Sequence, residues 1–114
     1  MNDTKLLRIN ELIKQEKIQE AQIEVSKLGI EYHKDLEYLY IRGMLFYKSK
    51  LYYAAIDSLL IALEFGQSNK IYELLSKIYY KLGNKDLSNK ILDTNLRSTT
   101  VNMLKNELSG IYRK

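Results

Sequence analysis

The chain of 114 residues lacks cysteine and proline altogether, and it has a single histidine and only five glycines. Without cysteine there are neither disulfides nor thiolate metal ligands, which is typical of a protein from a reducing compartment. The first twelve residues mix charged and apolar side chains and lack the continuous apolar segment of a secretory signal. The apolar run from Leu59 to Leu63 is far short of the roughly 20 residues that a membrane-spanning helix needs. We therefore expect a cytoplasmic protein without a membrane span.

Residues that carry common catalytic chemistry are equally scarce. His33 could act as a general base, but the chain has no cysteine and no serine that stands out as its partner. A catalytic nucleophile activated by His33 is therefore not predicted. Glu16, Glu20 and Glu24 share a helix face but lack the histidines of a helical di-metal site. A glycine-rich phosphate loop is also missing. The sequence predicts a protein that is not an enzyme and that uses neither a cofactor nor a metal.

The formal net charge of +4 comes entirely from the C-terminal third. Residues 1–80 contain eleven Lys/Arg and eleven Asp/Glu, whereas residues 81–114 contain seven and three. A solvated basic helix face and a docking site for an acidic partner both fit this surplus. Nucleic-acid binding requires basic residues interleaved with exposed aromatic residues on one face. Lys77, Tyr80, Lys81 and Lys85 meet that requirement only in part, so we do not expect a nucleic-acid partner.

Apolar residues recur at three- to four-residue spacing almost throughout, and alternating β-branched runs are missing. This pattern predicts an all-α chain of about seven helices. Short polar side chains ahead of the periodic segments are expected as N-caps, and glycines behind them are expected at helix C-termini. The expected N-caps are Asp35, Asn69, Asn84 and Thr99, and the expected C-terminal glycines are Gly29, Gly66 and Gly83.

Gly43 lies inside a periodic segment, although glycine costs roughly 1 kcal/mol relative to alanine in a helix interior. The apolar pattern repeats at shifts of 34 and then 33 residues, so that Leu12 corresponds to Phe46 and Phe46 to Tyr79. Glycine at this point lets the second helix of a helix pair approach closely, and we expect the contact at Ala55. The repeats span about 3–30, 36–65 and 69–96, and an amphipathic helix follows at about 98–112, with Val101, Leu104, Leu108 and Ile111 on one stripe.

A helix-turn-helix repeat of 34 residues resembles the tetratricopeptide repeat (TPR). The usual proline is absent, and the third copy has Ser88 and Asn95 where alanines are usual. The resemblance implies a single TPR-like domain over residues 1–114, a short right-handed solenoid of three helix pairs capped by the last helix. A helical bundle without a repeat relation is the alternative. The middle copy matches best, at Leu39, Gly43, Phe46, Ala55, Leu59 and Ala62, and the first copy matches only at Leu12, Ala21 and Val25.

In the TPR family the first helix of each pair lines a concave groove that binds protein segments. Here the groove positions are apolar and aromatic at the centre, which favours an amphipathic partner helix. Packing of these side chains against the last helix or against one another is the alternative. Some members clamp a partner's C-terminal carboxylate with a lysine and an asparagine, but Leu6 holds the lysine position, so this clamp is not expected. The expected groove residues are Leu6, Asn10, Ile13, Tyr40, Met44, Tyr47, Lys48, Lys77, Tyr80 and Lys81.

Two segments, "IRGMLFYKSKLYYAAI" and "YYKLGN", are similar to the small needle-subunit chaperones of bacterial type III secretion. Those chaperones have about this length, three degenerate repeats and a terminal amphipathic helix. The resemblance implies a cytoplasmic chaperone that holds a helix of a secreted, self-assembling subunit, often together with a small co-chaperone. A generic TPR adaptor and a solenoid segment that forms homodimers through the same face are the alternatives.

Overall fold

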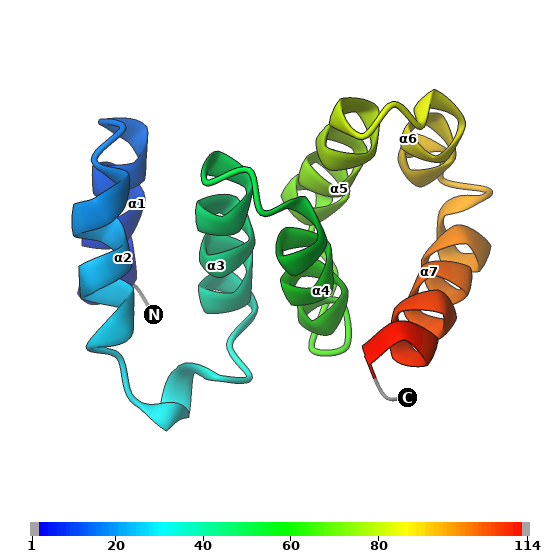
Figure 1. Cartoon of the computed structure of the whole chain (residues 1–114). Helices are drawn as coiled ribbons and strands as arrows, with labels where there is room; N and C mark the ends of the chain where they lie inside the picture. Colours follow the sequence, from blue (N-terminus) through cyan, green and yellow to red (C-terminus); the bar gives the residue numbers. More distant parts are fainter. Residues whose placement is uncertain (1–2, 113–114) are drawn as a thin grey trace. The chain divides into compact units, whose positions relative to one another are not determined.

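The computed structural model describes the backbone of residues 3–112 and the side chains of residues 3–107. Within residues 3–112 the chain forms seven α-helices and one 3₁₀ helix, and no strand (Figure 1). The all-α prediction is therefore confirmed. The chain divides into two compact units, Met1–Gly66 and Gln67–Lys114. The single TPR-like domain and the solenoid arrangement of the helix pairs stay predictions.

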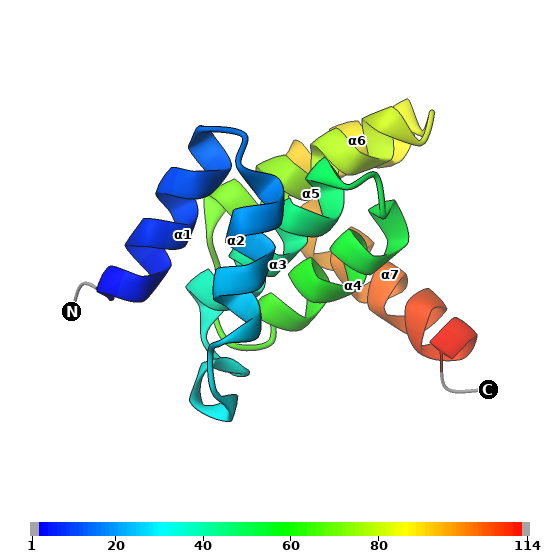
Figure 2. The same cartoon turned by 60° about the vertical axis from the view of Figure 1, so that its left-hand side comes forward.

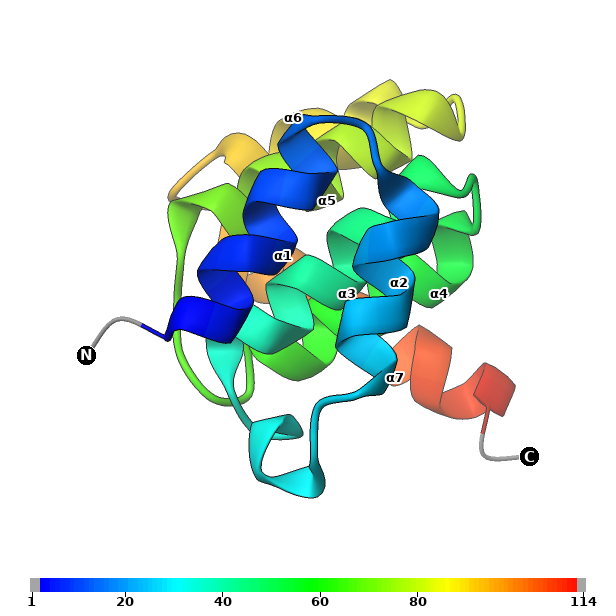
Figure 3. The same ribbon diagram turned by 90° about the vertical axis from the view of Figure 1, so that its left-hand side faces the viewer.

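The first unit consists of two helix pairs joined through a short 3₁₀ helix. Helices α1 and α2 pack against each other, α3 packs against α4, and both α1 and α2 contact α3. Figure 2 shows α1 and α2 side by side, and Figure 3 shows the chain leaving α2, passing through the 3₁₀ turn and returning to α3. The elements are α1 (Thr4–Lys14), α2 (Ile18–Ser26), η1 (Ile30–Tyr32), α3 (Leu36–Lys48) and α4 (Tyr52–Ala62).

The second unit contains α5 (Asn69–Lys81), α6 (Lys85–Leu92) and α7 (Arg97–Tyr112). Helix α6 packs against α5 on one side and contacts α7 on the other. Val101 and Leu104 of α7 are buried, as the amphipathic stripe predicts. The side chains of Leu108 and Ile111 lie outside the described residues, and the capping role of α7 in a solenoid stays a prediction.

Arg97 fastens the start of α7 to the end of α6. Its Nε donates a hydrogen bond to the carbonyl of Ile91 at 2.9 Å, and its guanidinium carbon lies 4.0 Å from the ring centroid of Tyr72. The Ile91 carbonyl lies in the last turn of α6, where it has no hydrogen-bond partner within the helix, so Arg97 supplies one.

The turn inside each helix pair has the same backbone structure in all three copies. The residue after the C-cap is left-handed each time, with φ of 59° at Glu16, 63° at Lys50 and 85° at Gly83. In the third copy the amide of Gly83 donates a hydrogen bond to the carbonyl of Tyr80 at 3.0 Å, and the amide of Asn84 donates one to the carbonyl of Tyr79 at 2.8 Å. The same two bonds recur at the other two turns, which is the Schellman motif. The steps from 16 to 50 and from 50 to 83 match the sequence repeat, so the repeat extends to backbone geometry.

Two of the four expected N-caps are confirmed. Asp35 and Asn84 each accept a hydrogen bond from a backbone amide three residues later. Asn69 is instead the first residue inside α5, and Thr99 lies inside α7, which already begins at Arg97. As N-caps, Asn69 was expected one residue late and Thr99 three residues late, since the residues before the two helices are Ser68 and Leu96.

Of the three glycines expected at helix C-termini, only Gly83 adopts the left-handed conformation. Gly29 is extended, with φ of −82° and ψ of 178°, and precedes η1, while Gly66 has no positive φ. The other two left-handed positions hold Glu16 and Lys50. A Schellman turn tolerates residues with a Cβ at a modest cost in free energy, so glycine alone does not locate such turns.

Gly43 is buried in α3, and its closest neighbour in α4 is Leu59. A Cβ atom at position 43 would lie 2.7 Å from Cδ2 and 2.8 Å from Cγ of Leu59. These distances are shorter than carbon atoms adopt in a packed core. Leu59 itself is fully buried. The glycine therefore makes room for a leucine side chain, and the expected close approach at Ala55 stays a prediction.

The third helix pair solves the same packing problem with two serines. Ser76 and Ser88 occupy the positions that correspond to Gly43 and Ala55, and both are buried. Their hydroxyl oxygens lie 2.7 Å apart, and Ser76 also donates to the carbonyl of Ser88 at 3.0 Å. Because both hydroxyl groups find partners, the polar pair between α5 and α6 is compatible with burial.

Asp3 joins the start of α1 to the 3₁₀ turn. Its carboxylate accepts hydrogen bonds from the amides of Lys5 and Leu6 at 2.9 and 3.2 Å, and from the Tyr32 hydroxyl at 2.8 Å. These hydrogen bonds hold the pKa of Asp3 below its ordinary value of 3.8. The hydrogen bond from Tyr32 lowers it most, and the two bonds from the backbone amides lower it further. The carboxylate thus holds both the cap of α1 and the turn before α3.

We expect Asp3→Asn to lower the free energy of unfolding at neutral pH and to lose this effect in acid. A carboxyl group with a lowered folded-state pKa contributes stability above its unfolded pKa, and this contribution disappears as pH falls through the folded pKa. Urea denaturation from neutral pH to well below 3.8 measures the difference between wild type and variant. Glu11→Gln, at an exposed position of the same helix, is the control at neutral pH. If the free energy of unfolding of the variant differs from that of wild type by the same amount at every pH, the proposed role of the Asp3 carboxylate is contradicted.

Candidate protein-binding surface

Helix α3 buries five residues and leaves three large residues partly exposed on another face. Its charged residues are Glu37, Arg42 and Lys48. Tyr40, Met44 and Tyr47 lie four and three residues apart, so they share a face of the helix, and each is partly exposed. We call these three residues the tyrosine face of α3. The buried residues of the same helix are Tyr38, Leu39, Ile41, Gly43 and Leu45.

Polar contacts lie beside both ends of the tyrosine face. Next to its first residue, the amide of Asn10 donates a hydrogen bond to the carboxylate of Glu37 at 3.3 Å. Next to its last residue, Lys48 forms an ion pair with Glu16, with Nζ and Oε1 2.8 Å apart. Both contacts join α3 to the first helix pair. Two expected groove residues, Asn10 and Lys48, are therefore occupied in holding the two pairs of the first unit together.

The ring of Tyr47 has an aromatic neighbour from the next helix. Its centroid lies 6.0 Å from that of Tyr52, the first residue of α4, with the ring planes tilted by 50°. Such tilted pairs stabilise beyond the area that they bury. The contact limits the freedom of Tyr47 while leaving the residue partly exposed, which reduces the entropy that it would lose on binding.

Leu6 and Ile13 differ from the sequence expectation, which placed them in an open groove. Their exposed fractions are 4% and 7%, so both are buried. The two residues flank Ile9 at helical spacing and continue its stripe, and α1 contacts both α2 and α3. The apolar stripe of α1 is a core stripe. The surface proposed below therefore omits Leu6 and Ile13.

The remaining expected groove residues belong to the second unit. Lys77, Tyr80 and Lys81 are exposed on α5, and the Tyr80 side chain is 58% exposed. The Nζ atom of Lys85 lies 5.7 Å from the centroid of the Tyr80 ring, within reach of a cation–π interaction. These four residues form a basic and aromatic patch on their own unit.

The sequence reasoning missed a hollow between α2 and α3 in the first unit. The guanidinium carbon of Arg42 lies 5.9 Å from the ring centroid of Tyr38 and 5.5 Å from that of Phe46. An arginine with aromatic residues four positions before and after it was the available signal, since this spacing puts all three on one helix face. The hollow has a volume of about 100 Å³ and is lined by Gln22, Val25, Arg42, Leu45 and Phe46.

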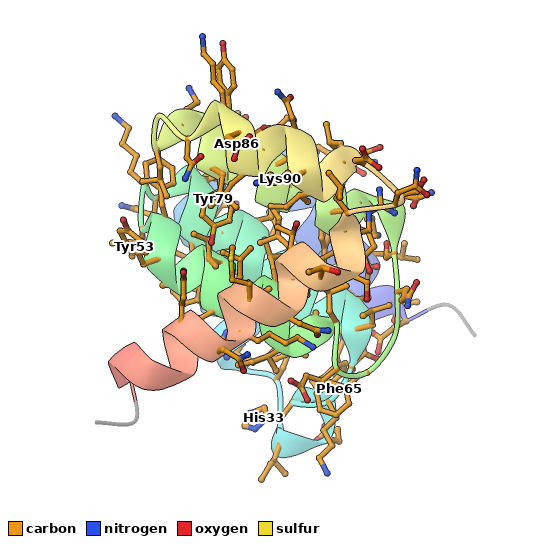
Figure 4. The ribbon with its side chains drawn as sticks, turned by 90° about the vertical axis from the view of Figure 1, so that its right-hand side faces the viewer. His33, Tyr53, Phe65, Tyr79, Asp86 and Lys90 are labelled. Carbon is orange, nitrogen blue, oxygen red and sulfur yellow. The ribbon has the colours of Figure 1, made fainter. Side chains whose placement is uncertain are left out.

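Other exposed side chains of note are scattered. Figure 4 shows Tyr53 on α4, Phe65 after it and His33 beyond the 3₁₀ turn. It also shows Asp86 and Lys90 on α6, which form an ion pair of 3.0 Å one turn apart. A pair of this kind on an exposed helix contributes about 0.3–0.5 kcal/mol at most. We therefore assign none of these residues to a site.

The described residues present neither a cluster of metal ligands nor a helix suited to crossing a membrane. That part of the chain has no group of three or more His, Asp or Glu side chains placed to hold a metal ion. None of its helices combines the length and the apolar character needed to cross a membrane.

Comparison with known proteins finds no relative: no family model matches the chain, and neither a curated protein nor a solved structure matches it significantly. Functional proposals for this protein therefore depend on its own residues.

Proposed function

We propose that this protein is a non-catalytic binding module of the TPR type, which holds an amphipathic helix of a partner protein on the tyrosine face of α3. One observation carries the proposal. Tyr40, Met44 and Tyr47 stay partly exposed along one face, although the same helix already buries five other residues. A helix that needed only to pack into its own unit would carry polar residues at these positions.

The chemistry of the tyrosine face suits a protein partner. Burying apolar surface against a partner stabilises the complex by about 25 cal/mol per Å² of area removed from water. Tyrosine and methionine are enriched at interfaces, and the flexible thioether of Met44 adapts to different partner side chains. Anchors at i, i+4 and i+7 form the kind of ridge that fits against the apolar face of another helix.

A narrower proposal is a cytoplasmic chaperone of the type III secretion needle-subunit kind. It rests on the resemblance of two sequence segments and on a simple physical requirement. A subunit that polymerises through an apolar helix must stay monomeric before export, and a chaperone that covers this helix removes the polymerising surface. A generic adaptor and a homodimer that uses the same face are the alternatives that an experiment must separate.

Photo-cross-linking tests the binding surface in the producing cell. We would replace Tyr47 by the photoreactive amino acid p-benzoylphenylalanine and identify the cross-linked protein by mass spectrometry. Tyr53 provides the matched control, because it is also a tyrosine of the first unit and is 60% exposed, but lies on α4. We expect a specific partner at position 47 and none at position 53.

The outcomes of this experiment distinguish the alternatives. A secreted, self-assembling partner supports the chaperone proposal, and a different partner supports an adaptor. A cross-link to a second copy of the chain, together with a dimer in light scattering, supports self-association. Equal cross-linking at positions 47 and 53 would show that the tyrosine face has no special role.

A further inference from the structure

The hollow between α2 and α3 presents an arginine whose hydrogen-bond donors are not used by any of the described residues. Among the described residues, Arg42 contacts the rings of Tyr38 and Phe46 but forms neither a hydrogen bond nor an ion pair. A guanidinium group has five N–H donors in a fixed, planar arrangement. Contacts with the two rings stabilise its charge and leave these donors available.

The surroundings hold the arginine in place. Tyr38 is buried and Phe46 is partly buried, and they lie one turn before and one turn after Arg42 on α3. Their rings restrict the long side chain, so a ligand that binds the guanidinium needs to order little more of it. Tyr38 is itself in ring contact with Tyr32 and His33, at centroid distances of 6.0 and 6.1 Å.

The size and the lining of the hollow limit its ligand. Its volume of about 100 Å³ is well below the roughly 300–1,000 Å³ of a site for a cofactor or drug-sized molecule. Val25, Leu45 and Phe46 make its walls apolar, and none of the described residues that line it is acidic or a lysine. Gln22 is already engaged, since its amide donates to the Ser49 hydroxyl at 3.2 Å. The hollow therefore fits one anionic group with an apolar stem.

We propose that this hollow binds a glutamate side chain of a protein partner. Arg42 would donate two parallel hydrogen bonds to the carboxylate oxygens, the geometry that its planar group favours. Val25, Leu45 and Phe46 would contact the methylene groups of the glutamate. Apolar walls and the absence of a lysine among the lining residues favour such a group over a strongly hydrated phosphate.

This site is separate from the tyrosine face. Arg42 is two residues from both Tyr40 and Met44, which places it about 200° around the helix from each, nearly opposite. The proposed function can therefore fail while the carboxylate site holds, and the reverse is also possible.

Titration of the full chain with three short peptides tests the carboxylate site. The first is acetylated and amidated with a central glutamate between two leucines, the second has glutamine in its place, and the third has a free C-terminus and no acidic side chain. The readout is the side-chain Nε–H resonance of Arg42 in a ¹H–¹⁵N NMR spectrum, assigned by its absence in Arg42→Lys. We expect a saturable shift with the first peptide and none with the second. Saturation with the third peptide but not with the first would overturn the assignment to a glutamate side chain.

Variants then test the role of the guanidinium group. Arg42→Lys keeps the charge but loses the planar pair of donors, and we expect it to bind the carboxylate peptide at least about tenfold more weakly. Arg8→Lys, at an exposed position of α1, is the matched control and is expected to bind like wild type. Equal shifts with the glutamate and glutamine peptides, no saturation with the glutamate peptide up to several millimolar, or unchanged affinity in Arg42→Lys would overturn the proposal. The wild-type comparison of acid and amide stands even if the variant does not fold.

Discussion

Gly43→Leu is expected to lower the free energy of unfolding by about 3 kcal/mol, the upper end of the usual range for overpacked cores. The reason is local and geometric. Even a single Cβ atom at this position would lie 2.7 Å from Leu59, and a leucine adds three further carbon atoms in the same direction. Leu59 is fully buried, so it has little room to move away. Urea denaturation followed by circular dichroism measures the change.

A double-mutant cycle with Leu59→Ala tests whether this one contact is responsible. Leu59→Ala alone is expected to destabilise by about 2–5 kcal/mol, because it leaves a cavity. In the combined variant the new leucine fills part of that cavity, so the total should be clearly smaller than the sum of the two single effects. Gly66→Ala is the control, since a Cβ there meets Leu36 at an ordinary 3.4 Å. Strict additivity would show that Gly43 and Leu59 do not pack as described.

The double variant Tyr40→Ala with Tyr47→Ala is expected to lose about 4 kcal/mol of partner binding, roughly a thousandfold in affinity. Each ring would be a hot-spot anchor, for which truncation costs about 2 kcal/mol or more. Both residues are only partly buried, so the fold should survive. The measurement is a calorimetric titration with the partner that cross-links at position 47.

Tyr53→Ala controls for the loss of a tyrosine ring in general, because its side chain is 60% exposed on α4. It should bind the partner as wild type does and melt at the same urea concentration. An unchanged affinity of the double variant would exclude the tyrosine face as the binding surface. Loss of helicity in the double variant would instead show that these two rings belong to the core.

The features that could be predicted from the sequence are those that depend on neighbours along the chain. The three- to four-residue spacing of apolar residues predicted an all-α fold, because that spacing puts them on one face of a helix. Asp35 and Asn84 were recognisable as N-caps, because each caps an amide only three residues away. The repeat shifts of 34 and 33 residues likewise reappear in the left-handed residues at 16, 50 and 83.

The candidate site was predicted only in part, because periodicity identifies a helix face but not the element that covers it. Tyr40, Met44 and Tyr47 were placed on one face by their spacing, and they do share it and stay partly exposed. Leu6 and Ile13 have equally regular spacing, but the contacts of α1 bury them. Nothing within α1 itself distinguishes these two outcomes.

By itself, the sequence determined the helices, their order and the apolar face of each, since these follow from local propensity and spacing. Only the tertiary structure decided that the Leu59 side chain lies closest to Gly43, and that a hollow forms beside Arg42. Each depends on the rotation and separation of two packed helices, to within about an ångström. Those quantities result from the fit of many side chains at once, because a close-packed interior leaves few voids and small changes in shape are felt throughout it.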